Sequence, residues 1–140
     1  MKTLVENHTS CAICGATSNL SIVGRYSICD NCSYIHSDVR SYSYKPAPDF
    51  RGKHDRYFGV ELEVVPAYNN NGGKALAVGL VHKSLGDLAY MKRDGSLPYN
   101  GFEIVTHPFS LHNMYDNRMF SKLANLPIKS FTEASCGLHV

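Results

Sequence analysis

The sequence predicts an α+β fold, in which a small metal-stabilised module is followed by a mainly antiparallel sheet with two helices on one face. Three observations predict it. Four cysteines stand in two Cys-x-x-Cys pairs before residue 33. Short segments after residue 56 alternate apolar and polar residues, and two stretches repeat apolar residues at helical spacing. A chain of 140 residues has room for one domain or for a small module and part of a larger one, and the early end of the paired cysteines favours the second.

The first module is predicted from the pairs Cys11 with Cys14 and Cys29 with Cys32. Each turn directs two thiolates at a point about 2.3 Å away, so that two turns complete a tetrahedral zinc site with no position for a substrate water. Paired disulfides are the competing use of four cysteines. The start of the chain lacks the apolar core of a secretory signal, which favours zinc and a reducing cytoplasmic compartment. We expect a zinc ribbon over 1–44.

Residues 45–56 are predicted to be a linker, because the segment is polar and Asp49 and Asp55 interrupt its basic run. The formal net charge is +2, and four thiolates with one Zn²⁺ would bring it near zero. A strong nucleic-acid binder shows a concentrated basic patch, so nucleic acid is not the partner we expect. No stretch approaches the roughly 20 apolar residues of a membrane span, and no membrane association is expected.

The segment 57–140 predicts the sheet and its helices. In the first strand, over 57–66, Glu61 and Glu63 share one face and the apolar residues share the other. In the strand over 101–108, Glu103 lies on the face opposite the apolar residues. The remaining elements expected are a hairpin turning at Gly24, a helix over 74–85, a strand over 87–93, a helix over 110–126 and a strand beginning at 136.

Four motifs of this segment occur in order: FGVELEV at 58–64, KRDGSL at 92–97, GFEIVTHP at 101–108 and CGLHV at 136–140. Together they resemble the amidoligase family, carboxylate–amine ligases related to glutamate–cysteine ligase and glutamine synthetase. The resemblance implies that 57–140 is the N-terminal part of a glutamine-synthetase-like catalytic domain. In that family the last motif continues with a second histidine and further catalytic domain. The resemblance therefore implies a truncated ligase, inactive alone and needing a complementary C-terminal segment.

The resemblance also assigns roles to individual residues. Such a ligase joins a carboxylate to an amine through an acyl phosphate made from ATP, whose phosphates are held by Mg²⁺ or Mn²⁺. Glu61 and Glu63 would be metal ligands, Glu103 a third carboxylate, and His139 a nitrogen ligand or phosphate contact. Asp94 would orient the amine or a metal-bound water. Hard cations prefer oxygen ligands, which explains these residue types. The carboxylate and amine substrates are not identified.

Four of these residues also have a plainer explanation. Glu61 and Glu63 could form the solvated face of an antiparallel sheet. Asp94 begins Asp-Gly-Ser, a common turn sequence, and His139 is near the last residue given, where a frayed end is the ordinary expectation.

The alternative function is a non-catalytic zinc-ribbon module that keeps the remnant of a ligase fold and binds a protein or a nucleic acid. Tyrosine and arginine are frequent interface anchors. A host protein is the partner expected in that case, since small proteins of this kind suggest a bacteriophage or its bacterial host cell. The residues that could form such a surface are Arg25, Tyr26, Tyr34, Arg40, Tyr42, Tyr44 and Lys45.

Overall fold

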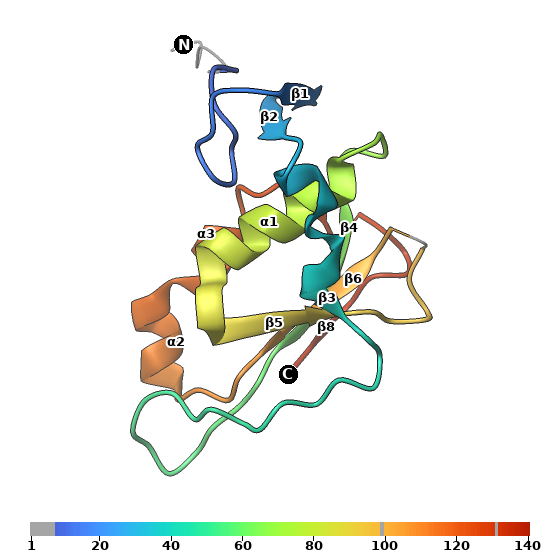
Figure 1. The fold of residues 1–140 in the computed structure, drawn as a ribbon. Helices are drawn as coiled ribbons and strands as arrows, with labels where there is room; N and C mark the ends of the chain where they lie inside the picture. The colour runs from blue at the N-terminus through green and yellow to red at the C-terminus, as the bar shows by residue number, and fades with distance from the viewer. Residues whose placement is uncertain (1–7, 99, 131) are drawn as a thin grey trace.

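The structure, a computed structural model, describes residues 8–98, 100–130 and 132–140 (Figure 1). It confirms the predicted α+β class, with a two-stranded hairpin and a mixed sheet of six strands. Figure 1 shows the hairpin at the N-terminal end of the molecule and the last strand among the strands of the larger sheet.

The hairpin is formed by β1 (Leu20–Val23) and β2 (Tyr26–Cys29), which pair antiparallel with Val23 opposite Tyr26. Gly24 occupies the turn at φ 60°. This left-handed backbone conformation favours glycine, which explains why the hairpin turns there as predicted. After the hairpin, a 3₁₀ helix η1 (Cys32–Asp38) leads into β3 (Val39–Arg40).

The larger sheet has the strand order β3, β5, β6, β4, β7, and β8 also pairs with β4. Pairing is antiparallel throughout, except that β3 runs parallel to β5. Its other strands have the following bounds: β4 Glu61–Pro66, β5 Ala89–Lys92, β6 Phe102–Thr106, β7 Ile128–Lys129 and β8 Leu138–His139. One edge of β4 faces β6, and the other edge is shared by β8 and β7.

In the described part of the chain, three α-helices accompany the sheet: α1 (Gly73–Leu85), α2 (Leu111–Asn117) and α3 (Met119–Leu123). A short 3₁₀ helix η2 (Gly86–Leu88) joins α1 to β5. The helix predicted over 74–85 corresponds to α1. The single helix predicted over 110–126 is divided in two, because Arg118 has a left-handed backbone at φ 49° that interrupts the helical path.

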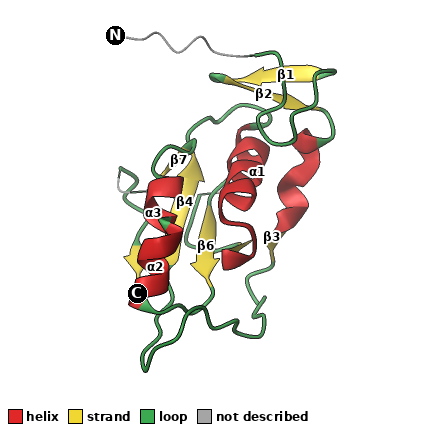
Figure 2. Ribbon diagram, turned by 90° about the vertical axis from the view of Figure 1, so that its left-hand side faces the viewer, coloured by secondary structure: helices red, strands yellow, loops and turns green. Residues whose placement is uncertain are grey.

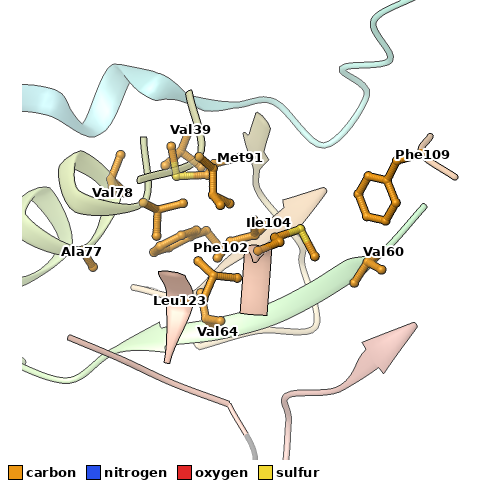
Figure 3. Packing of buried hydrophobic residues seen from close by; sticks show 13 residues of the cluster. Val39, Val60, Val64, Ala77, Val78, Met91, Phe102, Ile104, Phe109 and Leu123 are labelled. Atoms are coloured by element: carbon orange, nitrogen blue, oxygen red, sulfur yellow. The ribbon is translucent and has the colours of Figure 1, made fainter. Parts of the chain in front are cut away.

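The main core lies between the apolar face of the sheet and the helices α1 and α3 (Figures 2 and 3). Val64 and Phe102 are fully buried from the sheet side. Val78 of α1 and Leu123 of α3 pack against this face. The alternation in β4 and β6 thus has its expected result, with the apolar positions inside.

The helix α1 has a second apolar contact, with the ribbon. Leu76 and Leu80 form a separate cluster with Val23 and Ile28 of the hairpin and with three of the cysteines. Lys83 Nζ also donates a hydrogen bond to the Ala12 carbonyl at 2.8 Å. A helix buried on two sides is apolar around most of its circumference, as α1 is.

The division into 1–44, 45–56 and 57–140 stays a prediction. Several contacts cross its boundaries. β3 lies inside 1–44 yet pairs with β5 of the larger sheet. Within 45–56, the Arg51 amide donates to the Pro108 carbonyl at 2.8 Å, and the Ser110 amide donates to the Arg51 carbonyl at 3.0 Å. Among the described residues, no helix combines the length and apolar composition needed to cross a membrane.

The packing of the hairpin on α1 predicts unequal effects at its two isoleucines. Ile28 is 1% exposed and Ile22 is 65% exposed. We expect Ile28→Ala to lower the free energy of unfolding by about 2 to 5 kcal/mol, through lost burial and the cavity left behind. Ile22→Ala, the matched control, should change it by less than about 0.5 kcal/mol. Denaturant unfolding with zinc present measures both, and equal effects would contradict the packing described.

Candidate functional site

The four cysteines of the two pairs form one cluster. Their sulfur atoms all lie within 4.8 Å of one another, and Cys14 Sγ is 3.6 Å from Cys29 Sγ. Sulfurs around a tetrahedral zinc with bonds of about 2.3 Å are separated by about 3.8 Å, so the observed spacing suits that ion. None of the chain's five cysteines is in a disulfide. The cluster could therefore hold a zinc ion.

Tight turns at each pair bring the sulfurs together. In the first turn the Gly15 amide donates to the Cys11 carbonyl at 2.8 Å, and the Cys11 amide donates to the Ala16 carbonyl at 2.7 Å. After the hairpin, the Ser33 amide donates to the Asp30 carbonyl at 3.2 Å. The hairpin joins these turns, so strand pairing sets the position of the second pair relative to the first.

The environment of Cys11 favours its thiolate, the form that binds metal. Burial acts to raise the pKa of Cys11, but backbone N–H donors at Cys14, Cys29 and Ile13 outweigh it and lower the pKa to about 6. Cys32 has its pKa raised, first by burial and then by the other sulfurs around it. A cation among the four sulfurs would offset the repulsion between thiolates.

A second cluster consists of carboxylates on the polar face of the sheet. The register places Glu63 directly opposite Glu103, and Lys92 opposite Glu103 on its other side. Asp94 follows β5 in the loop to β6. Carboxylate oxygens of Glu63, Asp94 and Glu103 all lie within 4.8 Å of one another.

These carboxylates line a hollow of about 720 Å³, which we call the carboxylate cleft. All five residues to which the family resemblance gives roles line it. Glu61 and His139 lie at its more exposed side, opposite one another in the pairing of β4 with β8. His139 Nε2 is 3.8 Å from Glu63 Oε1. The residues that line the cleft are Tyr42, Ser43, Lys45, Glu61, Glu63, Lys92, Asp94, Glu103 and His139.

Sequence reasoning did not place four of these residues at this site. Ser43 and Lys92 were not singled out, and Tyr42 and Lys45 were suggested for a contact surface instead. Lys92 carried a usable signal, because it lies two residues before Asp94 at the end of a predicted strand, and side chains two residues apart in an extended segment face the same side. The other three come from the segment after β3, and nothing in their sequence indicates that β3 joins the sheet beside β5.

Two carboxylates of the cluster have opposite electrostatic environments. Glu103 is 6% exposed, and burial, followed by the charge of Glu61, raises its pKa although Lys92 Nζ lies 3.8 Å away. The pKa of Asp94 is lowered, because the amide and hydroxyl of Ser96 both donate to its Oδ1 at 2.7 Å. Asp94 is thus held ionised, whereas Glu103 takes up a proton more readily.

The structure divides the aromatic and basic residues suggested as a contact surface. The Arg25 guanidinium lies over the ring of Tyr26. That ring packs edge-on against the ring of Tyr68, with 6.4 Å between the ring centroids. Tyr42 and Lys45 instead line the carboxylate cleft. Arg25 and Tyr26 therefore lie on the hairpin, whereas Tyr42 and Lys45 lie at the cleft.

A scan against protein-family models found no match, and searches of curated proteins and of solved structures found none either. No family, relative or fold match therefore supports the amidoligase resemblance or a glutamine-synthetase-like fold. The cytoplasmic compartment and the bacteriophage association also stay predictions from the sequence. What the structure supports is the α+β fold and a cluster of four cysteines suited to zinc.

One zinc ion per chain is expected in protein purified under reducing conditions. Cys29→Ser should lose the zinc and unfold the ribbon, because an incomplete thiolate set forfeits much of a binding free energy of about 10 kcal/mol or more. Elemental analysis and circular dichroism measure the two effects. Cys136→Ser, at the cysteine outside the cluster, should retain the zinc. Stoichiometric zinc in Cys29→Ser would contradict the site.

The raised pKa of Glu103 predicts a pH dependence of stability. The folded protein holds the Glu103 proton at a pH where the unfolded chain, with a pKa of about 4.3, has lost it. The free energy of unfolding contributed by Glu103 is therefore fully present below the pKa of the unfolded chain. It is lost as the pH rises through the higher pKa of the folded protein. We expect Glu103→Gln to remove that loss, measured by denaturant unfolding at a series of pH values without added magnesium. Glu133→Gln, the control, should keep the wild-type dependence of unfolding free energy on pH. The same dependence in Glu103→Gln would contradict the raised pKa of Glu103.

Proposed function

We propose that this chain carries the divalent-cation site of an ATP-dependent carboxylate–amine ligase, as the N-terminal part of a glutamine-synthetase-like catalytic domain. The observation that carries the proposal is the convergence of Glu63, Asp94 and Glu103, from two strands and a loop, to within 4.8 Å of one another. The solvated-face alternative requires only that Glu61 and Glu63 point outward. It does not account for a loop carboxylate meeting two strand carboxylates, one of which is buried.

The electrostatics of the cluster favour a bound cation. Three carboxylates this close repel one another, and burial of Glu103 increases the cost of its charge. Lys92 supplies only one nearby ammonium, at 3.8 Å from Glu103. Mg²⁺ or Mn²⁺ would satisfy several carboxylate oxygens at once, since hard cations bind oxygen ligands at about 2.0 to 2.6 Å.

In this proposal the cleft residues divide the work of amide formation. A bound Mg²⁺ or Mn²⁺ would neutralise phosphate charge while the acyl phosphate forms. Glu61, Glu63 and Glu103 would hold the cation, and His139 would contribute a nitrogen ligand or a phosphate contact. Asp94, kept ionised by Ser96, orients the incoming ammonium group.

We also propose that the chain alone has little ligase activity and needs a complementary C-terminal segment. Support comes from the family resemblance, in which further catalytic domain follows the last motif. Phosphoryl transfer depends on holding the nucleotide in a fixed geometry, and the described cleft residues come only from the sheet and the segments beside it.

Release of ADP from ATP, measured with magnesium and mixed amino-acid acceptors, tests the function. We expect at most trace release from the chain alone and a large increase when a segment encoded after codon 140 is added. A Glu61→Gln and Glu63→Gln double variant should abolish that increase, whereas Glu133→Gln should leave it intact.

Two results would contradict the proposal. Turnover that survives the double variant would place the chemistry elsewhere. No turnover in any mixture, together with tight binding of a purified host protein, would favour the alternative of a non-catalytic zinc-ribbon interaction module.

A further inference from the structure

A second hollow, of about 970 Å³, adjoins the carboxylate cleft and has no role in the function proposed above. It lies between the segment that enters α1 and the loop from β5 to β6. Asp94 lines both hollows, so they meet at that residue. We call it the Lys74–Arg93 pocket, after the two cationic side chains that line it.

Lys74 and Arg93 have no acidic partner among the described residues. Within the described part of the chain, neither the Lys74 nor the Arg93 side chain makes a hydrogen bond or an ion pair. Lys74 is partly buried, and its pKa is lowered, first by burial and then by the charge of Arg93. Two like charges directed at one hollow repel each other, and an anion bound between them would relieve that repulsion.

Neutral donors complete the wall. Asn69, Asn70, Asn71 and Asn100 all line the pocket. Asn100 Nδ2 donates to Asn69 Oδ1 at 2.8 Å, which ties the two sides of the pocket together. The first turn of α1 begins beside Gly72, which provides no side-chain cap. The dipole of α1 adds positive potential at this end of the helix to that of the two side chains.

The hairpin of the ribbon packs against the turn that forms one wall of the Lys74–Arg93 pocket. Gly72 has φ +92°, and a Cβ there would come within 2.8 Å of Ile28 Cδ1 of the hairpin. The close contact fixes the turn that carries the asparagines and Lys74. The pocket is therefore held by the same packing that joins the ribbon to α1.

From this geometry we propose that the Lys74–Arg93 pocket binds phosphate oxyanions, and that it holds the polyphosphate chain of a nucleotide next to the carboxylate cleft. The guanidinium of Arg93 suits phosphate because its donors match two oxygens at once. Asp94 would repel a bare anion at the shared end. A phosphate there is favoured only when a divalent cation lies between it and the carboxylates.

The placement next to the cleft rests on the proposed function, whereas oxyanion binding in the pocket does not. The two hollows can therefore be tested separately on the full chain with zinc bound. Inorganic tripolyphosphate without added divalent cation is the probe for the pocket. Mn²⁺ alone is the probe for the carboxylates.

We expect calorimetric titration to show tripolyphosphate binding that weakens about tenfold or more in Lys74→Gln and in Arg93→Gln, since each variant removes a donor of charge-assisted hydrogen bonds. Lys122→Gln, which removes the same charge from α3, should bind as the wild type does. Both pocket variants should retain zinc and the wild-type affinity for Mn²⁺. Arg93 is exposed, so its replacement provides a test even if Lys74→Gln folds poorly.

Comparison of ATP with tripolyphosphate identifies the source of the phosphates. Tighter binding of ATP, lost in the same two variants, supports a nucleotide. Equal binding supports the oxyanion site and overturns the assignment to a nucleotide. Tripolyphosphate binding that is absent, or unchanged in both variants, would overturn the pocket while leaving Mn²⁺ binding, and with it the proposed function, intact.

Discussion

The antiparallel pairing of β4 with β6 is the interaction on which the rest of the structure depends. Its register sets Val64 opposite Phe102 and Glu63 opposite Glu103. The first pair is fully buried in the main core, and the second lies in the carboxylate cleft. Because side chains alternate along a strand, a slip of one residue would move the carboxylates into the core and the apolar pair into the cleft. Core packing therefore fixes the geometry of the candidate site.

The helix α1 connects the cysteine cluster to the carboxylate cleft. One side of it packs on the sheet beneath the cleft, and another side forms the apolar cluster of the ribbon with Ile28. From the second cysteine pair the chain passes through η1 and β3 directly to Tyr42, which lines the cleft. A small ribbon cannot bury enough surface to be stable alone. Its stability thus depends on packing against α1, and a zinc ion in the cysteine cluster would add to it. The wall of the cleft depends on the ribbon in turn.

The features predicted correctly from the sequence are those governed by local pattern. Alternation located β4 and β6, helical spacing located α1, and the paired cysteines located the cluster. The parallel pairing of β3 with β5 was not predictable, since two residues carry no periodic signal and their partner is distant in sequence. The left-handed turn at Arg118 was also missed, because arginine seldom adopts it. The residues that β3 brings to the cleft were missed for the same reason as β3 itself.

The central claim is that carboxylates from β4 and β6, with Asp94 of the loop after β5 beside them, form a site for one divalent cation. Paramagnetic broadening by Mn²⁺, recorded on isotope-labelled protein with zinc bound, tests it most directly, since broadening falls off steeply with distance from the ion. The account predicts that low Mn²⁺ concentrations broaden the amide signals of Glu63, Asp94 and Glu103 first and leave those of the hairpin sharp. Broadening that begins elsewhere, or that persists unchanged in Glu63→Gln, would contradict it.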